Sequence, residues 1–429
     1  MNTKKINMSG QKNKSILQLN LVFILFNLFV LNSSNIFTQT GWYNMNVSFG
    51  GGGIYFKDFD NGIVGNYKTT NNGSTWLFMG IFSGGSSLSF LNQNTGYGVL
   101  SNSILKTTNF GENWVSQNNP SSQFLNGIIF PDVNTGFACG DGGTLIKTTN
   151  GGSNWFAIEP LPFPLGGAYY FRNVFFTNTL TGFVAGYRNA DTSVFIKTTN
   201  GGINWTTQRF TITNWGRFTS MFFLNANTGY IGATSNGNIL KTTDGGIGWF
   251  SVLVPTTNTI NSLYFPSPLT GYASCYGGQV LKTSNSGNNW YLQTTGTGSI
   301  LNSIFFINNL TGYVTGDNNT LLKTTDGGGA PIGITPISNE VPVDFRLEQN
   351  YPNPFNPTTN INFSIPKAGF TSIKIYDITG RLVQTLFEEQ LAPGSYKAEW
   401  NASQMPSGIY IYRIESGSFT QSRKMILIK

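Results

Sequence analysis

Short apolar runs alternate with polar turns along most of this chain, and the pattern recurs. An apolar run such as Ile304-Phe-Phe-Ile307 precedes a Thr-Gly turn, and shorter runs such as Tyr313-Val-Thr315 and Thr320-Leu-Leu-Lys-Thr324 follow it. An Asn/Asp-Gly turn then leads to a Trp that begins one more run. Short runs bounded by turn residues predict β-strands, so each unit predicts four of them.

Two phrases define the repeat. The first, Lys-Thr-Thr/Ser-Asn/Asp-x-Gly with a Trp three residues later, begins at Lys68, Lys106, Lys147, Lys197, Lys241, Lys282 and Lys323. Its copies lie 38 to 50 residues apart, and from the second copy on each follows a Thr-Gly-Tyr or Thr-Gly-Phe phrase. Four-stranded units at this spacing are typical of propeller blades. The pattern predicts an all-β chain with a seven-bladed β-propeller over residues 41–329.

The seventh copy of the first phrase lacks its Trp. Trp42 lies 14 residues before Phe56, the same spacing that separates Trp76 from Phe90. We therefore expect the N-terminal strand to supply the fourth strand of the seventh blade and to close the ring.

The two ends of the chain differ from the repeats. Residues 1–40 carry four lysines before an apolar run, Leu21 to Leu31, that is too short for a bilayer span. This predicts a cleaved signal peptide, with an uncleaved anchor as the alternative. Pro and Gly predict a linker at 330–344. Alternation of period two then predicts a small immunoglobulin-like β-sandwich at 345–429.

Composition removes several classes of function. Residues 41–344 hold twelve basic and twelve acidic residues, so the surplus that nucleic-acid binding needs is missing. There is no histidine, which excludes His-dependent triads and disfavours a zinc site. We expect no metal and no cofactor. Cys139 and Cys275 lie three repeats apart, which favours two buried thiols over a disulfide bridge.

Thr69-Thr-Asn71-Asn-Gly73-Ser-Thr-Trp76 and its copies resemble the Asp-box, or BNR repeat, Ser-x-Asp-x-Gly-x-x-Trp. Together with the Thr-Gly-Tyr phrase and the seven-fold count, they resemble propellers of the photosystem II assembly-factor type over about 41–329. The Asx side chain is expected to cap its own turn, so the motif is structural and not an active site. Its positions are Asn71, Gly73, Trp76, Asn109, Gly111, Trp114, Asn150, Gly152, Trp155, Asn200, Gly202, Trp205, Asp244, Gly246, Trp249, Asn285, Gly287, Trp290, Asp326, Gly328 and Trp42.

Three phrases of the tail carry a second resemblance: Tyr351-Pro-Asn-Pro-Phe-Asn-Pro357, Ile373-Lys-Ile-Tyr-Asp-Ile-Thr-Gly-Arg381 and Pro406-Ser-Gly-Ile-Tyr-Ile-Tyr-Arg413. They are similar to the type A C-terminal sorting domain of the type IX secretion system. The resemblance implies passage through the periplasm, and recognition of residues 345–429 by the translocon and a sorting peptidase. It also implies release or surface attachment, with no transmembrane segment in the mature chain. A carbohydrate-binding sandwich is the alternative.

Candidate binding residues cluster in blades three to five. The connection from Trp155 to Phe176 is 21 residues long, and all four propeller arginines fall within blades three to five. Arg172 aligns with Asn126, Asn261 and Asn302, which could ring the channel mouth. Arginines and exposed aromatics commonly serve recognition. The predicted patch is Tyr169, Tyr170, Arg172, Tyr187, Arg188, Arg209, Trp215 and Arg217; the alternative is a merely variable, solvated loop region.

The sequence favours a secreted or surface, non-catalytic propeller that binds an unknown protein or glycan and not nucleic acid. The alternative is an Asp-box glycoside hydrolase, sialidase- or glucanase-like. The loop-face carboxylates available to it are Asp141, Glu159, Asp191 and Asp317. A role in photosystem assembly rests on fold analogy alone and fits poorly with the sorting tail.

Overall fold

The computed structural model describes residues 41–429 except 81–86, 159–167, 190–191, 212–214, 235–236, 330–333, 339, 392, 404 and 429. The predicted signal peptide therefore lies outside the described residues, as do Glu159 and Asp191. The described chain consists of β-strands, with one short 3-10 turn at η1 (Tyr276–Gly278). Among these residues, no helix is long and apolar enough to cross a membrane.

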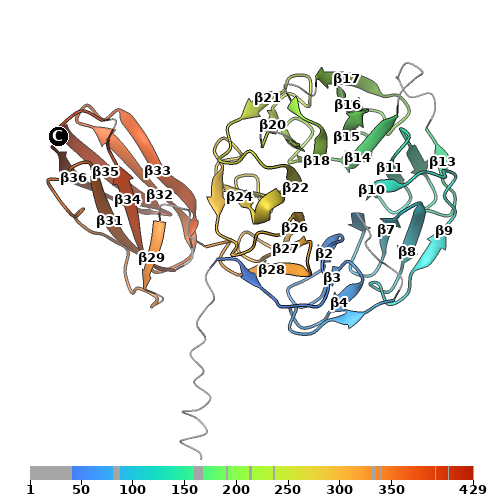
Figure 1. Ribbon diagram of the computed structural model, residues 1–429, viewed down its shortest axis with the longest axis horizontal. Helices are drawn as coiled ribbons and strands as arrows, with labels where there is room; N and C mark the ends of the chain where they lie inside the picture. Colours follow the sequence, from blue (N-terminus) through green and yellow to red (C-terminus); the bar gives the residue numbers. More distant parts are fainter. Residues whose placement is uncertain are drawn as a thin grey trace, which may run out of the picture. The chain divides into compact units, whose positions relative to one another are not determined.

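Seven four-stranded antiparallel sheets succeed one another around a common centre (Figure 1). We number them as blades one to seven and name the strands of each blade a to d from the centre outward. Blades one to three are β2 (Ile54–Phe56), β3 (Gly62–Val64), β4 (Tyr67–Thr69) and β5 (Leu77–Phe78); β6 (Ser87–Phe90), β7 (Gly96–Leu100), β8 (Ser103–Thr107) and β9 (Val115–Gln117); β10 (Leu125–Ile129), β11 (Gly136–Gly140), β12 (Leu145–Thr148) and β13 (Phe156–Ala157).

The longest propeller strands belong to blade four. Blades four to six are β14 (Tyr169–Phe176), β15 (Gly182–Arg188), β16 (Thr192–Thr198) and β17 (Thr206–Thr211); β18 (Phe218–Phe223), β19 (Gly229–Ala233), β20 (Ile239–Thr242) and β21 (Phe250–Val252); β22 (Ile260–Tyr264), β23 (Gly271–Cys275), β24 (Val280–Thr283) and β25 (Tyr291–Gln293). Blade seven combines β26 (Leu301–Phe306), β27 (Gly312–Gly316) and β28 (Thr320–Thr324) with β1 (Tyr43–Asn44) from the other end of the propeller.

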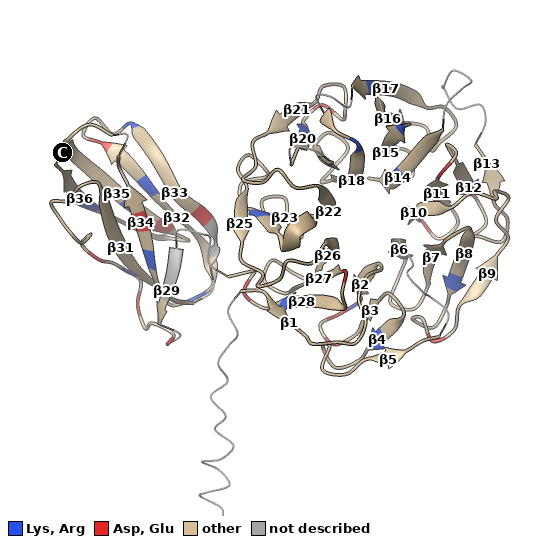
Figure 2. Cartoon of the chain, in the orientation of Figure 1, with Lys and Arg blue, Asp and Glu red and all other residues tan. Residues whose placement is uncertain are grey.

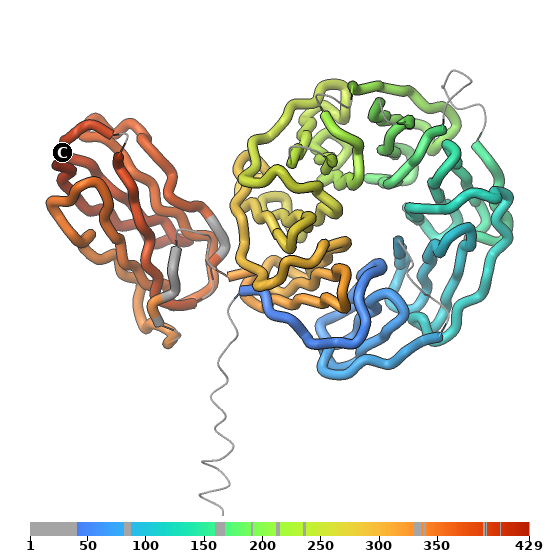
Figure 3. The backbone as a smooth tube through the Cα atoms, viewed as in Figure 1, coloured from blue at the N-terminus to red at the C-terminus, as the bar shows by residue number. Residues whose placement is uncertain are grey.

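The N-terminal strand closes the ring as predicted. β1 pairs antiparallel with β28, so that Tyr43 lies opposite Lys323, and Figure 3 shows the two segments side by side. The Gly41 N–H donates to Asp326 Oδ2 at 2.9 Å. In the other six Asp-boxes the residue before the Trp makes this bond to the Asx oxygen. The seventh Asp-box is thus assembled from two distant parts of the chain.

The Trp of each box packs edge-on against the Phe that ends or follows strand a. Trp42 meets Phe306 with ring centroids 5.7 Å apart at 87°, and Trp290 meets Phe265 at 5.9 Å and 85°. Both Trp side chains are buried. T-shaped aromatic pairs add about 0.5–1.5 kcal/mol to the burial of their surface. The split seventh box therefore has the same packing as a continuous one.

Neighbouring blades are also joined by polar contacts on the Asp-box side. Tyr97 OH and Lys106 Nζ both donate to the Gly151 carbonyl of the next blade, each at 2.8 Å. At the closure, Tyr313 OH and Lys323 Nζ reach Asn72 of blade one, at 2.6 and 2.7 Å from its Oδ1. Burial lowers the pKa of Lys323 below its usual value. The repeated Lys, together with the Tyr where a blade has one, therefore connects neighbouring blades.

The tail forms two further four-stranded sheets around one core. The first sheet runs β29 (Ile334–Ser338), β34 (Gly394–Asn401), β31 (Thr358–Ile365), β30 (Arg346–Leu347); the second runs β33 (Leu382–Leu391), β32 (Gly369–Asp377), β35 (Gly408–Ser416), β36 (Phe419–Leu427). Alternate residues of β31 are buried, as the period-two pattern predicts. Trp400 and Tyr412 are fully buried in this core.

The segment 330–344, predicted as a linker, contains β29, which pairs with β34. That part of the prediction is wrong. The Pro content suggested a linker, but Pro336 lies in the edge strand of its sheet, where a missing N–H is tolerated.

Both cysteines are free and buried. Burial raises the pKa of Cys275 to about 12 and also raises the pKa of Cys139. At neutral pH both are therefore protonated thiols that serve as small core residues.

Candidate ligand-binding face

The Asp-box side chains are occupied by their own turns. In the first copy the Gly73 N–H donates to Thr69 Oγ1 at 2.9 Å, and the Thr75 N–H donates to Asn71 Oδ1 at 2.9 Å. The Thr–Gly bond recurs in all seven copies. Gly73 has φ +80°, which disfavours any residue with a Cβ. The motif is a turn built from side-chain caps, at the end of the blades opposite to the connections described next.

Strand order divides the propeller into two faces. The chain enters each blade at the start of strand a, through a connection from strand d of the previous blade. Because neighbouring strands are antiparallel, the turn that joins strands b and c lies at the same end of the blade as this connection. We call this end the loop face. The a–b turns and the Asp-boxes lie at the other end. Charged residues are sparse along the propeller ribbon (Figure 2).

In the described part of the propeller, five blades carry a β-bulge near the start of strand a, and the pairing with strand b skips one residue of each bulge. The skipped residues are Asn126, Arg172, Thr219, Asn261 and Asn302. Bulges re-aim side chains. The Asn126 amide donates to the Phe171 carbonyl of the next blade, and Asn261 donates to Leu301 O, each at 2.9 Å. Asn126 and Asn261 therefore each act as a clamp between neighbouring blades.

Arg172 differs from these asparagines because its guanidinium lies among aromatic rings. Its Nη2 donates to Tyr187 OH at 2.7 Å, and its Nη1 lies 3.5 Å from Asp141 Oδ1 in blade three. The guanidinium is 5.7 Å from the Tyr170 ring and 5.2 Å from the Tyr187 ring. Arg217 approaches the same Tyr187 ring at 5.0 Å. We call Tyr170, Arg172, Tyr187 and Arg217 the arginine cluster.

Adjacent strands hold the arginine cluster in place. Tyr170 and Tyr187 are direct partners in the β14–β15 ladder, and their rings stack at 5.2 Å. All four side chains are partly exposed. The Arg172 side chain is 32% exposed in spite of its contacts, so part of its donor fork faces solvent. The cluster presents two cations next to two aromatic rings on the loop face.

The other four residues of the predicted patch lie elsewhere. Tyr169 is buried in a blade-three and blade-four core cluster, and Arg188 lies 5.8 Å from its ring. Arg209 is exposed on the outermost strand, opposite Val194. Trp215 packs on Phe210 at 5.8 Å. The structure therefore brings together half of the predicted patch.

Asp141 is not part of the predicted patch, although it joins the arginine cluster from the previous blade. Asp141 also accepts a hydrogen bond from Asn126 Nδ2 at 2.9 Å. Asp317 occupies the matching position in blade seven and accepts from Asn302 Nδ2 at 2.7 Å. Each of these carboxylates therefore accepts a hydrogen bond from the bulge asparagine of its own blade. In the described part of the chain, no group of three or more His, Cys, Asp or Glu could hold a metal ion.

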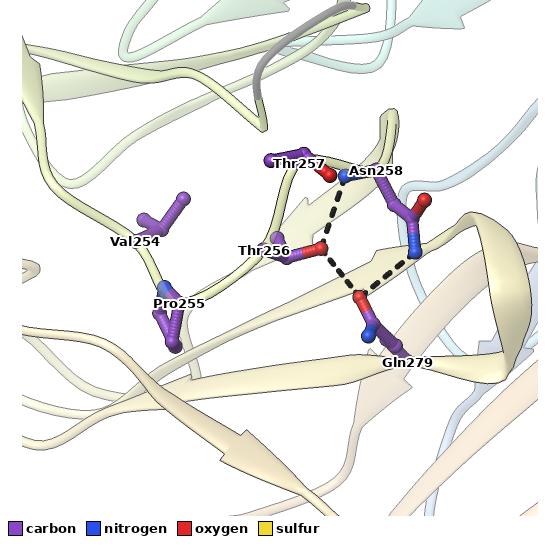
Figure 4. A pocket seen from close by; sticks show the side chains of 6 residues that line it. All are labelled: Val254, Pro255, Thr256, Thr257, Asn258 and Gln279. Atoms are coloured by element: carbon purple, nitrogen blue, oxygen red, sulfur yellow. Dashed lines mark hydrogen bonds between the residues drawn. The ribbon is translucent and has the colours of Figure 1, made fainter.

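Described residues line two hollows that open on the loop face. One of about 460 Å³ lies at the connection from blade five to blade six, beside Gln279 (Figure 4). The other, of about 300 Å³, lies at the ring closure and is lined by residues that include Phe49, Tyr67 and Asn319. Nothing in the sequence pattern distinguished either hollow.

Two family models match parts of the chain. Residues 106–264 match the model described as photosynthesis system II assembly factor YCF48, and residues 349–429 match the secretion system C-terminal sorting domain. No curated protein sequence matches. YCF48 from Cyanidioschyzon merolae is similar in structure, with 18% identity, a TM-score of 0.55, and coverage of 66% of this chain and 98% of that one.

Two further solved structures share the fold. YCF48 bound to D1 peptide has 17% identity and a TM-score of 0.54, with coverage of 68% of this chain and 96% of that one. An ancestral GH74 enzyme has 14% identity and a TM-score of 0.52, with coverage of 90% of this chain and 63% of that one. At such identities the likeness shows the fold alone.

The sheets, the repeats and these matches define an Asp-box β-propeller. Residues 106–264 are similar to propellers of the photosystem II assembly-factor type, and residues 349–429 are similar to the secretion system C-terminal sorting domain. This domain indicates export to the cell surface or release from the cell.

Proposed function

We propose that this chain is an exported, non-catalytic interaction propeller that binds an acidic group of a protein or glycan partner through the arginine cluster. The observation that carries the proposal is the convergence of Arg172 and Arg217 on one Tyr187 ring, at 5.2 and 5.0 Å. Guanidinium groups that are held by aromatic rings and remain partly exposed suit carboxylate, sulfate or phosphate oxygens. The sorting tail supports export, with the translocon and a sorting peptidase as the partners of residues 345–429.

The contacts of the carboxylates support a binding role over hydrolysis. A glycosidase needs two carboxylates about 5–9 Å apart, one of them available as an acid. Asp141 is paired with Arg172 and Asn126, and Asp317 is bonded to Asn302. Oxygen atoms of both carboxylates are therefore engaged in structural contacts with neighbouring side chains.

Charge reversal tests the cluster. We expect Arg172→Glu and Arg217→Glu to weaken binding at least tenfold, because a charge-assisted hydrogen bond contributes about 1.5–3 kcal/mol and about 1.4 kcal/mol corresponds to a factor of ten. Arg209→Glu is the matched control, since it makes the same charge change on the outer strand of the same blade.

Binding would be measured on an array of acidic and neutral glycans, and by pull-down from surface and extracellular fractions, with glycan hydrolysis assayed in parallel. Unchanged binding by both cluster variants would overturn the proposed site, and saccharide release would overturn the non-catalytic assignment.

A further inference from the structure

A carboxylate is fixed beside the arginine cluster. Asp141, which follows strand b of blade three, lies opposite Tyr170 in an isolated antiparallel β-bridge, and its Oδ1 lies 3.5 Å from Arg172 Nη1. The Asn126 amide donates to the same oxygen at 2.9 Å. Contacts therefore hold both the backbone and the side chain of Asp141, while 22% of the side chain stays exposed. A negative charge is a built-in part of this binding face.

The same turn occurs in blade seven without an arginine. The Asp141 N–H donates to Phe124 O at 2.8 Å, and the Asp317 N–H donates to Ile300 O at 2.9 Å. Each carboxylate accepts a hydrogen bond from the bulge asparagine of its blade. Among the described residues, Asp141 forms an ion pair with Arg172, whereas Asp317 forms none. The turn therefore does not require an arginine, and the ion pair is specific to the arginine cluster.

The ion pair changes the net charge that a ligand meets. The guanidinium groups of Arg172 and Arg217 lie 5.2 and 5.0 Å from the Tyr187 ring. Asp141 compensates the charge of Arg172, and within the described part of the chain no carboxylate forms an ion pair with Arg217. Two positive charges and one negative charge leave the group with one net positive charge.

One net positive charge suits a ligand group with a single negative charge. A carboxylate and a sulfate ester each carry one charge, whereas a phosphate monoester carries about 1.5 to 2 negative charges at pH 7. The additional charge of a phosphate would lose hydration and would be repelled by Asp141. Because Coulomb energy is proportional to the charge of the ligand, this repulsion is about twice as large for a dianion as for a monoanion. A fixed like charge is a common means of excluding a wrong ligand.

We propose that Asp141 is a specificity-determining residue of the arginine cluster, and that it selects singly charged oxyanions, carboxylates or sulfate esters, over phosphate monoesters. This selectivity rests on the function proposed above, because it concerns the acid bound by the same two arginines. Asp141 acts on the ligand through its charge and needs no direct contact with it.

The experiment titrates the full exported chain with methyl glucuronide, glucose 6-sulfate and glucose 6-phosphate, at pH 7.5 and constant ionic strength, and follows binding by ligand-observed NMR. We expect the wild type to bind the glucuronide and the sulfate at least about fivefold more tightly than the phosphate. Asp141→Asn keeps an oxygen that can accept from Asn126 and removes the charge. It should raise affinity about threefold for the sulfate and about tenfold for the phosphate, since the second gain is roughly the square of the first.

Asp317→Asn is the matched control, because it removes the same charge from the equivalent turn of blade seven and also keeps the acceptor for its asparagine. It should bind all three probes as the wild type does. Melting curves of both variants check that the turns stay folded.

The outcomes separate this selectivity from the proposed function. Equal gains for sulfate and phosphate in Asp141→Asn, or a wild-type preference for the phosphate, would overturn the selectivity and leave the binding site in place. Weaker binding of all probes by Asp141→Asn would show that the carboxylate only positions Arg172, which also overturns the selectivity. Absence of binding of every probe by both the wild type and Asp141→Asn would overturn the proposed function, and the selectivity with it.

Discussion

At the scale of single residues, the Asp-box tolerates Asn because the turn requires a side-chain oxygen and not a charge. Five copies have Asn at this position, while Asp244 and Asp326 carry a carboxylate. Asp244 accepts hydrogen bonds from the Gly248 N–H at 2.9 Å and from Thr242 Oγ1 at 2.8 Å. These two bonds, the Gly248 bond first, lower the pKa of Asp244 below its usual value.

Asp244→Asn is therefore expected to remove a pH dependence without a loss of stability at pH 7. A lowered folded-state pKa means that the carboxylate contributes stability above its unfolded pKa of about 3.9, and that this contribution is lost as pH falls through the lower folded value. Thermal unfolding at pH 7 and pH 3 measures the effect. The wild type should lose more stability than the variant on acidification, and equal losses would contradict the assignment.

The arginine cluster shows which site residues the alignment of the repeats predicts and which it does not. Arg172 was placed with Asn126 from the sequence, and both are bulge residues on strand a. Grouping Tyr169 with Tyr170 overlooked the fact that adjacent strand residues point to opposite faces. Asp141 belongs to the previous blade, and no local pattern connects it to Arg172.

At the scale of elements, strand β1 supplies the fourth strand of the seventh blade, which in every other blade is supplied by the chain that follows strand c. Gly41 and Trp42 occupy the last two positions of the box that begins at Lys323, and the intervening positions end at Gly329. The register of Trp42 was predictable because the seventh copy lacks its Trp and because Trp42 lies as far before Phe56 as Trp76 lies before Phe90. The strand β29 was not predictable, because its Pro content resembles that of a linker and only its pairing with β34 identifies it.

A circular permutant follows from the split box. A propeller that begins at residue 50 and continues from Gly329 directly into residues 41–49 has an uninterrupted seventh box of the normal length. We expect it to fold with a melting temperature within a few degrees of the original, because all strand pairs are kept. Circular dichroism and thermal unfolding test this, with an otherwise identical permutant carrying Trp42→Ala as control. That control should lose about 3–5 kcal/mol of stability. If the permutant that retains Trp42 does not fold, the split-box assignment is contradicted.

At the scale of the whole molecule, the chain contains two sets of sheets that do not exchange strands. Seven sheets are completed within residues 43–324, and the two remaining sheets within residues 334–427. The core clusters divide in the same way, since one contains only residues from Leu347 to Leu427 and the other seven contain none of these. Each set therefore buries its own apolar surface, which is the condition for folding and acting separately.

This division predicts that export and binding can be separated by one truncation. A chain that ends at Gly329 keeps every propeller strand, and we expect it to melt with the same propeller transition and to retain ligand binding. Because it lacks the sorting domain, it should accumulate inside the cell envelope, whereas the full chain reaches the surface or the medium. Fractionation with immunoblotting measures where each chain accumulates, and calorimetry measures the melting transition of the propeller. The cut must precede β29, because a cut at 344 would leave that strand without β34 as its partner. Surface arrival of the truncated chain would show that the propeller itself carries an export signal.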